Sequence, residues 1–277
     1  MEVIVYGNGE SRQKFDQLQF MGDFTTWGCN AIYRDYPVDA LVCVDGGIMH
    51  EIGASGYIYN NLCYFRSWSK LPEYAYDSLV QDNFFEGWHD SLKTENDKGH
   101  FHNFVMTGTD PNQIMRMYHI IKQGYEERNE PFDSADILLK LGNHHQWITW
   151  VDDEDKVRLI PEPFLGWSAG PIAVRMMIED QSPEEVYLIG FDMKSDDGLI
   201  NNVYKGTNNY APSYANEIPS VNWKKQHAEN FVTYPNVVFY HVSSDAEEID
   251  EWKSHKNVDY LTFHDLKIKL DIYPTIQ

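Results

Sequence analysis

The first residues whose spacing suits chemistry are two glycines that follow a short apolar run near the start of the chain. The run reads Glu2-Val-Ile-Val-Tyr-Gly-Asn-Gly-Glu-Ser11, so Gly7 and Gly9 flank Asn8 in a turn and Ser11 stands at a helix start. Glycine adopts positive φ and admits a ligand close to the backbone, while the positive end of a helix attracts anions. The pattern predicts a nucleotide phosphate site. A turn that needs glycine only for its geometry is the alternative, because the third glycine of the dinucleotide motif is missing.

A second segment repeats this chemistry later in the chain. Ser168, Ala169 and Gly170 lead into an apolar helical pattern, and Pro171 suits its first turn. The next apolar run ends in Asp192, which places a carboxylate at the carboxyl end of a strand. Open α/β sheets bind ligands at that edge, so we expect both segments to face one crevice.

A third carboxylate, Asp45, follows the apolar run 41–44 and precedes two glycines. It is expected either to touch a ribose or an acceptor at the same edge or to cap a helix. Around the site, a negatively charged nucleotide would need local counter-charge, because 43 acidic against 22 basic residues give the chain a net charge of -21. The basic residues considered for this role are Arg12, Arg34, Lys205, Lys224 and Lys225.

Short apolar runs recur along the chain and are the elements that must hold these residues. Several runs are continuous rather than alternating, which is typical of strands buried on both faces of a parallel sheet. We predict a doubly wound α/β fold with a mostly parallel, Rossmann-like sheet. The predicted strands are residues 3–6, 24–27, 40–44, 62–65, 104–106, 186–189 and 237–241, and the predicted helices are residues 11–20, 110–128, 168–180 and 223–234.

Length and composition predict one α/β domain over residues 1–277. A polar, aromatic-rich stretch at about 57–103 is expected to be an inserted excursion that packs over the sheet as a lid. Residues 143–160 are expected to form a hairpin around an acidic turn. Three unpaired cysteines and no leader or membrane-length apolar run indicate a cytoplasmic protein without a metal site, and a homo-oligomer is among the expected states.

Four blocks of the chain resemble, in the same order, those of the bacterial sialyltransferases related to the Campylobacter lipooligosaccharide enzymes. The first and third blocks are the glycine turn and the Ser-Ala-Gly segment described above. The second is Trp27-Gly-Cys-Asn-Ala-Ile-Tyr33 and the fourth is Tyr187-Leu-Ile-Gly-Phe-Asp192. The first and last blocks are shared by a wider group that includes archaeal pterin pyrophosphokinase-like proteins.

The resemblance implies a role for individual residues. It implies that Asn8 contacts the nucleotide phosphate, that Asn30 contacts the nucleotide, and that Ser168 to Gly170 bind the donor. It places Asp192 at the strand end of the active site. The tyrosines that assist the departing phosphate correspond to Tyr204 and Tyr210, and His227 is the candidate for the catalytic base.

The function predicted is transfer of a sugar from a nucleotide-activated donor to a hydroxyl acceptor such as a saccharide, by direct displacement and without a metal or other cofactor. The high negative charge disfavours binding to nucleic acid. Two alternatives stay open. One is diphosphate transfer of the pterin pyrophosphokinase type, with Mg²⁺ held by Asp45, Asp192 and Asp196. The other is a nucleotide- or sugar-binding module without chemistry.

Overall fold

The structure is a computed structural model, and it describes part of the chain. The described residues are 2–15, 23–66, 68–69, 126–129, 131, 147–148, 157–161, 164 and 166–271. The chain divides into two compact units, the first made of Met1–Val42 and Pro163–Gln277 and the second of Cys43–Glu162. The excursion expected at 57–103 falls within the second unit, and most of it lies outside the described residues.

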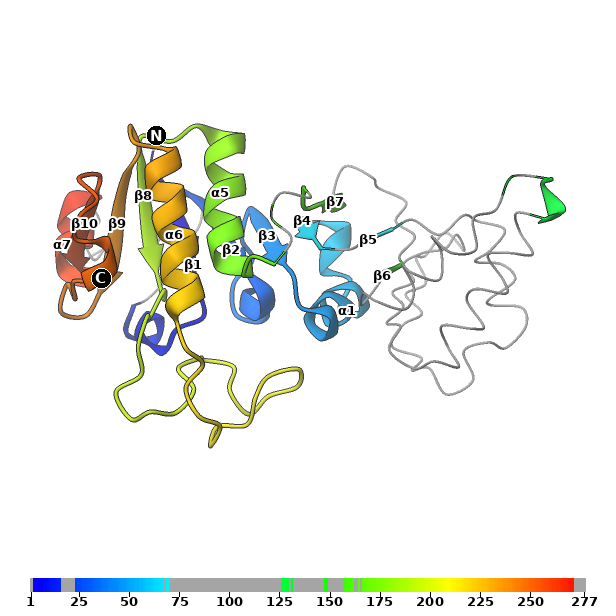
Figure 1. Cartoon of the computed structure of the whole chain (residues 1–277), viewed down its shortest axis with the longest axis horizontal. Helices are drawn as coiled ribbons and strands as arrows, with labels where there is room; N and C mark the ends of the chain where they lie inside the picture. The colour runs from blue at the N-terminus through cyan, green and yellow to red at the C-terminus, as the bar shows by residue number, and fades with distance from the viewer. Residues whose placement is uncertain are drawn as a thin grey trace, which may run out of the picture. The chain divides into compact units, whose positions relative to one another are not determined.

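The first unit is built on parallel strands in the order β10-β9-β8-β1-β2-β3 (Figure 1). Every pair of neighbouring strands in it is parallel, as the continuous apolar runs predict. The strands are β1 (Glu2–Tyr6), β2 (Thr25–Cys29), β3 (Ala40–Cys43), β8 (Glu185–Ile189), β9 (Val238–Ser243) and β10 (Val258–Thr262).

Helices cover both faces of this sheet. Consecutive side chains of a strand point to opposite faces of the sheet, so Phe239 and Tyr240 of β9 lie on different faces. The Phe239 ring packs on Phe231 of α6 (Val221–Thr233) with ring centroids 4.7 Å apart. The Tyr240 ring lies 4.6 Å from the ammonium nitrogen of Lys269 in α7 (Phe263–Lys269). Helices α6 and α7 therefore lie on opposite faces, which confirms the doubly wound fold.

Helix α5 (Ala169–Gln181) shares a face with α6, and the two lie side by side in Figure 1. Its apolar side covers β1 and β2, and most of its residues are buried. An amide holds the two helices together, because Asn230 Nδ2 of α6 donates a 2.9 Å hydrogen bond to the carbonyl of Pro171. The missing N–H of Pro171 costs nothing in the first turn of α5, as expected from its position.

The strand order reverses between β1 and β8, and this reversal positions the site. From β1 the chain moves outward through β2 and β3, and it returns to β8 and moves outward in the other direction through β9 and β10. Ligands of open α/β sheets bind at the carboxyl ends of the strands at such a reversal. Gly7 to Ser11 follow β1 and Gly190 to Asp192 follow β8, so both predicted segments stand at this point.

Two elements at the end of the chain were not predicted. Strand β10 reads Val-Asp-Tyr-Leu-Thr and is partly exposed, since it is the edge strand, so it lacks the continuous apolar run used to predict strands. Helix α7 begins at Thr262, whose hydroxyl accepts from Asp265 N–H while the Asp265 carboxylate reaches back to Thr262. This capping box accounts for the start of a helix that is short for a propensity-based prediction.

The second unit contains α1 (Gly46–Ala54), η4 (Tyr57–Tyr59), and two pairs of parallel strands. The pairs are β4 (Leu62–Phe65) with β7 (Val157–Leu159), and β5 (Trp68–Ser69) with β6 (Trp147–Ile148). The described strands of the expected 143–160 hairpin, β6 and β7, therefore pair with other strands and not with each other. The strand expected at 104–106 and residues 110–125 of the helix expected at 110–128 lie outside the described residues, and residues 126 and 127 are helical.

Candidate functional site

The turn after β1 is locked to the turn after β8 by its backbone. Gly7 N–H donates to the carbonyl of Ile189, and Gly9 N–H donates to the carbonyl of Gly190, both at 2.8 Å. A Cβ atom on Gly7 would lie 2.3 Å from the Gly190 carbonyl oxygen, and one on Gly9 would lie 2.5 Å from Cγ of Asp192. The glycines are required because two backbones touch here.

This finding corrects the expected use of the two glycines. Gly9 has φ -65°, and neither Gly7 nor Gly9 is among the positive-φ glycines of the described chain. Their N–H groups already donate hydrogen bonds to the carbonyls of Ile189 and Gly190, so they are not available to bind an anion. The positive φ is at Gly190, at 72°, on the partner turn.

The Asp192 carboxylate holds the loop after β1 in place through hydrogen bonds to Ser11. One oxygen, Oδ2, accepts a 2.8 Å hydrogen bond from Ser11 N–H, and the other accepts from the Ser11 hydroxyl. In the described part of the helix predicted at 11–20, the chain forms a 3-10 turn, η1 (Glu10–Lys14), with Gly9 as its cap, and residues 16–20 lie outside the described residues. Ser11 thus lies inside the turn, and the acceptor for its N–H comes from the end of β8.

We expect Asp192→Asn to lower the free energy of unfolding by about 2 kcal/mol, since hydrogen bonds to a charged acceptor are worth roughly 1.5–3 kcal/mol and the amide carries no charge. Urea denaturation measures the loss. The matched control is Asp196→Asn, an exposed carboxylate of the following loop, which should change stability little. Equal stability of the two variants would show that the Ser11 contacts contribute nothing.

Asn8 presents a buried acceptor at the same edge. Its side-chain nitrogen donates to the Cys29 carbonyl at 3.0 Å, and the Cys29 sulfur lies 3.9 Å from it. Because a carbonyl only accepts, the amide orientation follows, and Oδ1 is left buried without a partner among the described residues. Asn8 therefore suits a hydroxyl or amino donor of a ligand better than the phosphate contact that the resemblance implies.

Asn30 follows Cys29 and begins η3 (Asn30–Arg34) at the end of β2. Its φ of 52° is in the left-handed region, which Asn tolerates better than most residues. Asn8 and Asn30 are thus brought to neighbouring strand ends through Cys29. This placement fits the prediction that both contact one ligand.

Segment 201–212 folds onto the ends of β1 and β2 as a loop, as its composition predicts. It contains turns and neither helix nor strand. Val203 N–H donates to the Asn8 carbonyl at 2.9 Å, and Asn201 Oδ1 accepts from Glu10 N–H at 2.8 Å. The loop is therefore anchored directly to the glycine turn.

Tyr204 of this segment is buried, and its hydroxyl is fully engaged. It donates to Asp35 Oδ2 at 2.7 Å and accepts from Nη2 of Arg12 at 2.7 Å. Nη2 of Arg12 also lies 2.9 Å from the same Asp35 oxygen. Burial raises the pKa of Tyr204, and the hydrogen bond to Asp35 raises it further. Tyr204 therefore holds two charged groups together, which is not the expected contact with a leaving phosphate.

Tyr210 and Arg34 lie beside this cluster. The Arg34 guanidinium is 5.3 Å from the Tyr204 ring centroid and 5.7 Å from that of Tyr210, within the range of a cation–π contact. Arg34 also donates to the Thr207 hydroxyl and the Asn208 carbonyl, at 2.8 and 3.0 Å. The Tyr210 oxygen accepts from Ala31 N–H at 3.4 Å. Two arginines and two tyrosines thus gather at the ends of β1 and β2.

The structure does not place His227 in the site. It lies in the middle of α6 with 0% of its surface exposed, among the rings of Phe191, Phe231 and Trp252. Neither ring nitrogen has a hydrogen-bond partner in the described structure. Burial, with a smaller contribution from nearby His241, lowers the pKa of His227 to about 3. An enclosed imidazole cannot reach an acceptor, so the prediction of His227 as the base is wrong.

The start of α5 packs against the turn after β8, at the carboxyl ends of the strands. Ser168 N–H donates to Oε1 of Gln226 at 3.0 Å, so this group is used within the protein. A Cβ on Gly170 would lie 2.8 Å from the Phe191 ring, so the helix start packs directly on the turn after β8. Ala169 is the first residue of the helix and is buried. Asp45, in contrast, belongs to the second unit, where it precedes α1 without a side-chain cap bond.

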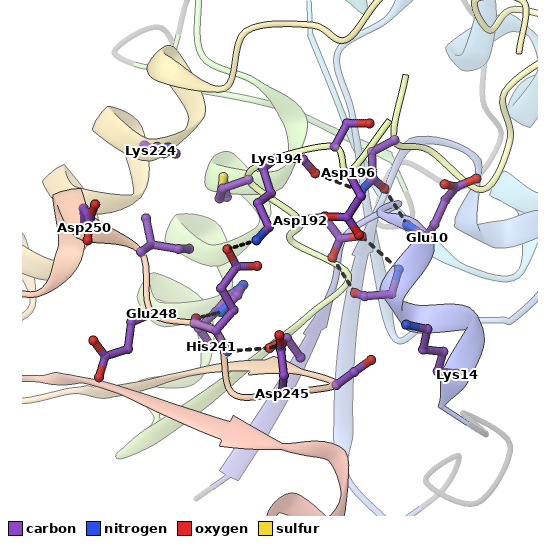
Figure 2. A pocket seen from close by; sticks show the side chains of 18 of the residues that line it. Glu10, Lys14, Asp192, Lys194, Asp196, Lys224, His241, Asp245, Glu248 and Asp250 are labelled. Atoms are coloured by element: carbon purple, nitrogen blue, oxygen red, sulfur yellow. Dashed lines mark hydrogen bonds and ion pairs between the residues drawn. The ribbon is translucent and has the colours of Figure 1, made fainter. Parts of the chain in front are cut away.

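A cavity of about 730 Å³ opens beside Asp192, over the ends of β8 and β9 (Figure 2). Nine carboxylates and three lysines line it, so its field disfavours a phosphate. The lysines are partly neutralised already, since Lys194 pairs with Glu247 at 2.6 Å and Lys224 with Glu251 at 3.0 Å. Arg12 and Arg34, which follow β1 and β2, are not among the residues that line this cavity.

His241 of β9 lines this cavity and was not singled out from the sequence. Its two ring nitrogens face carbonyl oxygens, with Nε2 3.2 Å from Phe191 O and Nδ1 3.3 Å from Glu247 O. Burial lowers its pKa, and these carbonyls partly offset that effect. His241 links the turn after β8 to the loop after β9. A lone histidine in an apolar run carries no sequence signal for this role.

Within the described residues, no three His, Cys, Asp or Glu side chains are grouped so as to hold a metal ion. Lys205, one of the considered counter-charges, pairs with Glu10 at 2.8 Å. None of the helices that the structure describes combines the length and apolar composition needed to cross a bilayer.

Comparison with known proteins gives no match to a family model and none to a curated protein. A search of solved structures finds the sialyltransferase CST-II in complex with a trisaccharide acceptor and CMP, at 12% identity and a TM-score of 0.35, covering 87% of this chain and 80% of that one. It also finds CstII from Campylobacter jejuni in complex with a substrate analogue and cytidine-5'-monophosphate, at 11% identity and a TM-score of 0.36, covering 87% and 79%. The chain is thus similar to sialyltransferase structures at low identity.

Proposed function

We propose that this protein is a glycosyltransferase that moves a sugar from a nucleotide-activated donor to a hydroxyl acceptor by direct displacement, without a metal ion. The observation that carries the proposal is the cluster of Arg12, Arg34, Tyr204 and Tyr210 at the reversal of the strand order. A chain with a net charge of -21 concentrates cations and phenols at the edge where α/β sheets bind nucleotides. The resemblance of the four sequence blocks supports the same activity.

Each part of the site has a task in this reaction. When the bond from the anomeric carbon to the phosphate breaks, the phosphate gains charge, and the Arg34 guanidinium and the Tyr210 phenol lower the barrier by stabilising it. The unpartnered Oδ1 of Asn8 accepts from a hydroxyl or amino group of the nucleotide. Segment 201–212 keeps water from the reacting centre while it is docked.

Tyr210→Phe is expected to slow transfer by about tenfold to a hundredfold while donor affinity stays nearly unchanged, because a charge-assisted hydrogen bond to the leaving phosphate is worth roughly 1.5–3 kcal/mol. Steady-state kinetics separates the two effects. Tyr204→Phe removes the contacts to Arg12 and Asp35, so it should also speed hydrogen exchange in segment 201–212. Turnover of Tyr210→Phe at the parental rate would exclude this role.

A binding module without chemistry is the second candidate, and the burial of His227 favours it, because the predicted base is absent from the site. Donor turnover distinguishes the two. Diphosphate transfer with Mg²⁺ is less well supported, since both oxygens of Asp192 are engaged by Ser11. That reaction would make activity dependent on Mg²⁺.

Thermal unfolding in the presence of CMP, UDP, ADP and GDP, each with and without Mg²⁺, tests the proposal. A nucleotide at 100 times its dissociation constant adds roughly 2.7 kcal/mol to stability and raises the melting temperature. We expect one nucleotide, CMP by analogy with the ligand of the similar structures, to do so equally with and without Mg²⁺. No shift with any of the four would contradict the proposal.

A further inference from the structure

With His227 enclosed in the core, the proposed transfer needs another group to take the acceptor proton. We propose that Asp35 is the general base, an inference that rests on the proposed function. Asp35 follows η3 at the end of β2, beside the arginines and tyrosines assigned to the donor. It is an exposed carboxylate at the edge where a ligand of this fold binds, with 42% of its side chain accessible.

The two oxygens of Asp35 are held differently. Oδ2 accepts from the buried Arg12 at 2.9 Å and from the Tyr204 hydroxyl at 2.7 Å, which fixes the orientation of the carboxylate. Oδ1 has no partner among the residues that the structure describes. A carboxylate anchored through one oxygen, with the other open to solvent, has the geometry required to accept a proton from a positioned hydroxyl.

The other titratable groups at this edge are less suitable. Both oxygens of Asp192 accept hydrogen bonds from Ser11, so neither can contact a ligand unless one of these bonds breaks. His241 is 3% exposed, and both its nitrogens face backbone carbonyls. Glu10, which also lines the cavity, is paired with Lys205 at 2.8 Å, and the remaining carboxylates of the cavity belong to the segments that follow β8 and β9.

The step balances with Asp35 as the base. The acceptor oxygen forms a bond to the anomeric carbon, and its O–H bond breaks as the proton passes to Oδ1 of Asp35. The bond from the anomeric carbon to the phosphate oxygen breaks, and its electron pair leaves with the nucleotide. Arg12 and Tyr204 remain hydrogen-bonded to Oδ2, so the carboxyl group keeps its orientation after it is protonated.

Asp35→Asn tests the proposal with little change of shape. An amide with its oxygen at the Oδ2 position keeps both hydrogen bonds, while the nitrogen in place of Oδ1 cannot take a proton. With CMP-N-acetylneuraminic acid as the probe and water or lactose as the acceptor, we expect CMP release to fall at least a hundredfold, in line with the roughly 10²–10⁴-fold contribution of general bases. The dissociation constant of CMP should change less than threefold.

Two further variants separate chemistry from structure. Asp35→Ala should be inactive and regain part of its rate in sodium formate, which supplies a carboxylate. Asp39→Asn is the matched control, because Asp39 also accepts two hydrogen bonds through one oxygen, from Thr26, but belongs to no part of the site, and it should keep the parental rate.

Parental turnover of Asp35→Asn would overturn the assignment. So would a loss of turnover without formate rescue that is accompanied by weakened CMP binding, since that combination describes a structural ion pair. A parent protein that neither binds CMP nor releases it from the probe overturns the proposed function itself, and is distinguished from a failure of Asp35 alone by the parent's own activity.

Discussion

Gly7→Ala is expected to lower the free energy of unfolding by about 3 kcal/mol or more, at the upper end of what overpacking costs. The added carbon would lie 2.3 Å from the backbone oxygen of Gly190 and 2.9 Å from its carbonyl carbon. Neither atom can rotate away, because Gly190 also accepts from Gly9 N–H. Relief requires the ends of β1 and β8 to separate, so equilibrium urea unfolding should show the loss directly.

Gly198→Ala is the control for this experiment. Gly198 has φ 72°, but a Cβ there would meet no atom within 4 Å. The substitution therefore reports backbone strain alone, which costs about 1–2 kcal/mol for a residue in the left-handed region. If Gly7→Ala were no more destabilising than Gly198→Ala, the close contact between the two turns would not exist as described.

His227→Leu is expected to remove the part of the protein's acid sensitivity that comes from this buried imidazole. Burial lowers the pKa of His227 to about 3, from a usual value near 6.5, so the unfolded chain binds this proton first as the pH falls. The stability contribution of the neutral imidazole is complete above about pH 6.5 and is lost between there and about pH 3. At pH 4.5 the loss amounts to about 3 kcal/mol.

Chemical denaturation of the parent and of His227→Leu between pH 4 and pH 8 measures this effect. At pH 8 the two proteins should be similarly stable, since replacing a buried group without hydrogen bonds by an apolar side chain of like volume is nearly neutral. At pH 4.5 the variant should be the more stable by about 3 kcal/mol. His264→Gln, at an exposed position of α7, is the control. A variant as acid-sensitive as the parent would contradict the buried, neutral state of His227.

The sheet and its reversal were predictable because their signal is local. The apolar runs at β1, β8 and β9 are continuous, and only strands buried on both faces favour that pattern. Asp192 at a strand end follows from the same reasoning. The edge strand β10 gave no such signal, because half-exposed residues interrupt it.

The chemistry of the site was harder to predict, for reasons of geometry. A Gly-x-Gly turn looks the same whether glycine is needed for positive φ or for contact between two backbones, and only the second holds for Gly7 and Gly9. Spacing along the chain placed His227 after Asp192 but carries no information on depth, and the helix turns it into the core. Asp35 is a single charge after a short turn, and its partner Tyr204 is 169 residues away.

Release of CMP from CMP-N-acetylneuraminic acid by the parent protein, measured in EDTA and again in excess Mg²⁺, tests the central claim most directly. The proposed function assigns the stabilisation of the leaving phosphate to side chains at the strand ends, Arg34 and Tyr210, and not to a metal ion. The account predicts release at equal rates in both conditions, faster with a saccharide acceptor present. Release only in Mg²⁺, or CMP binding without any release, would contradict it.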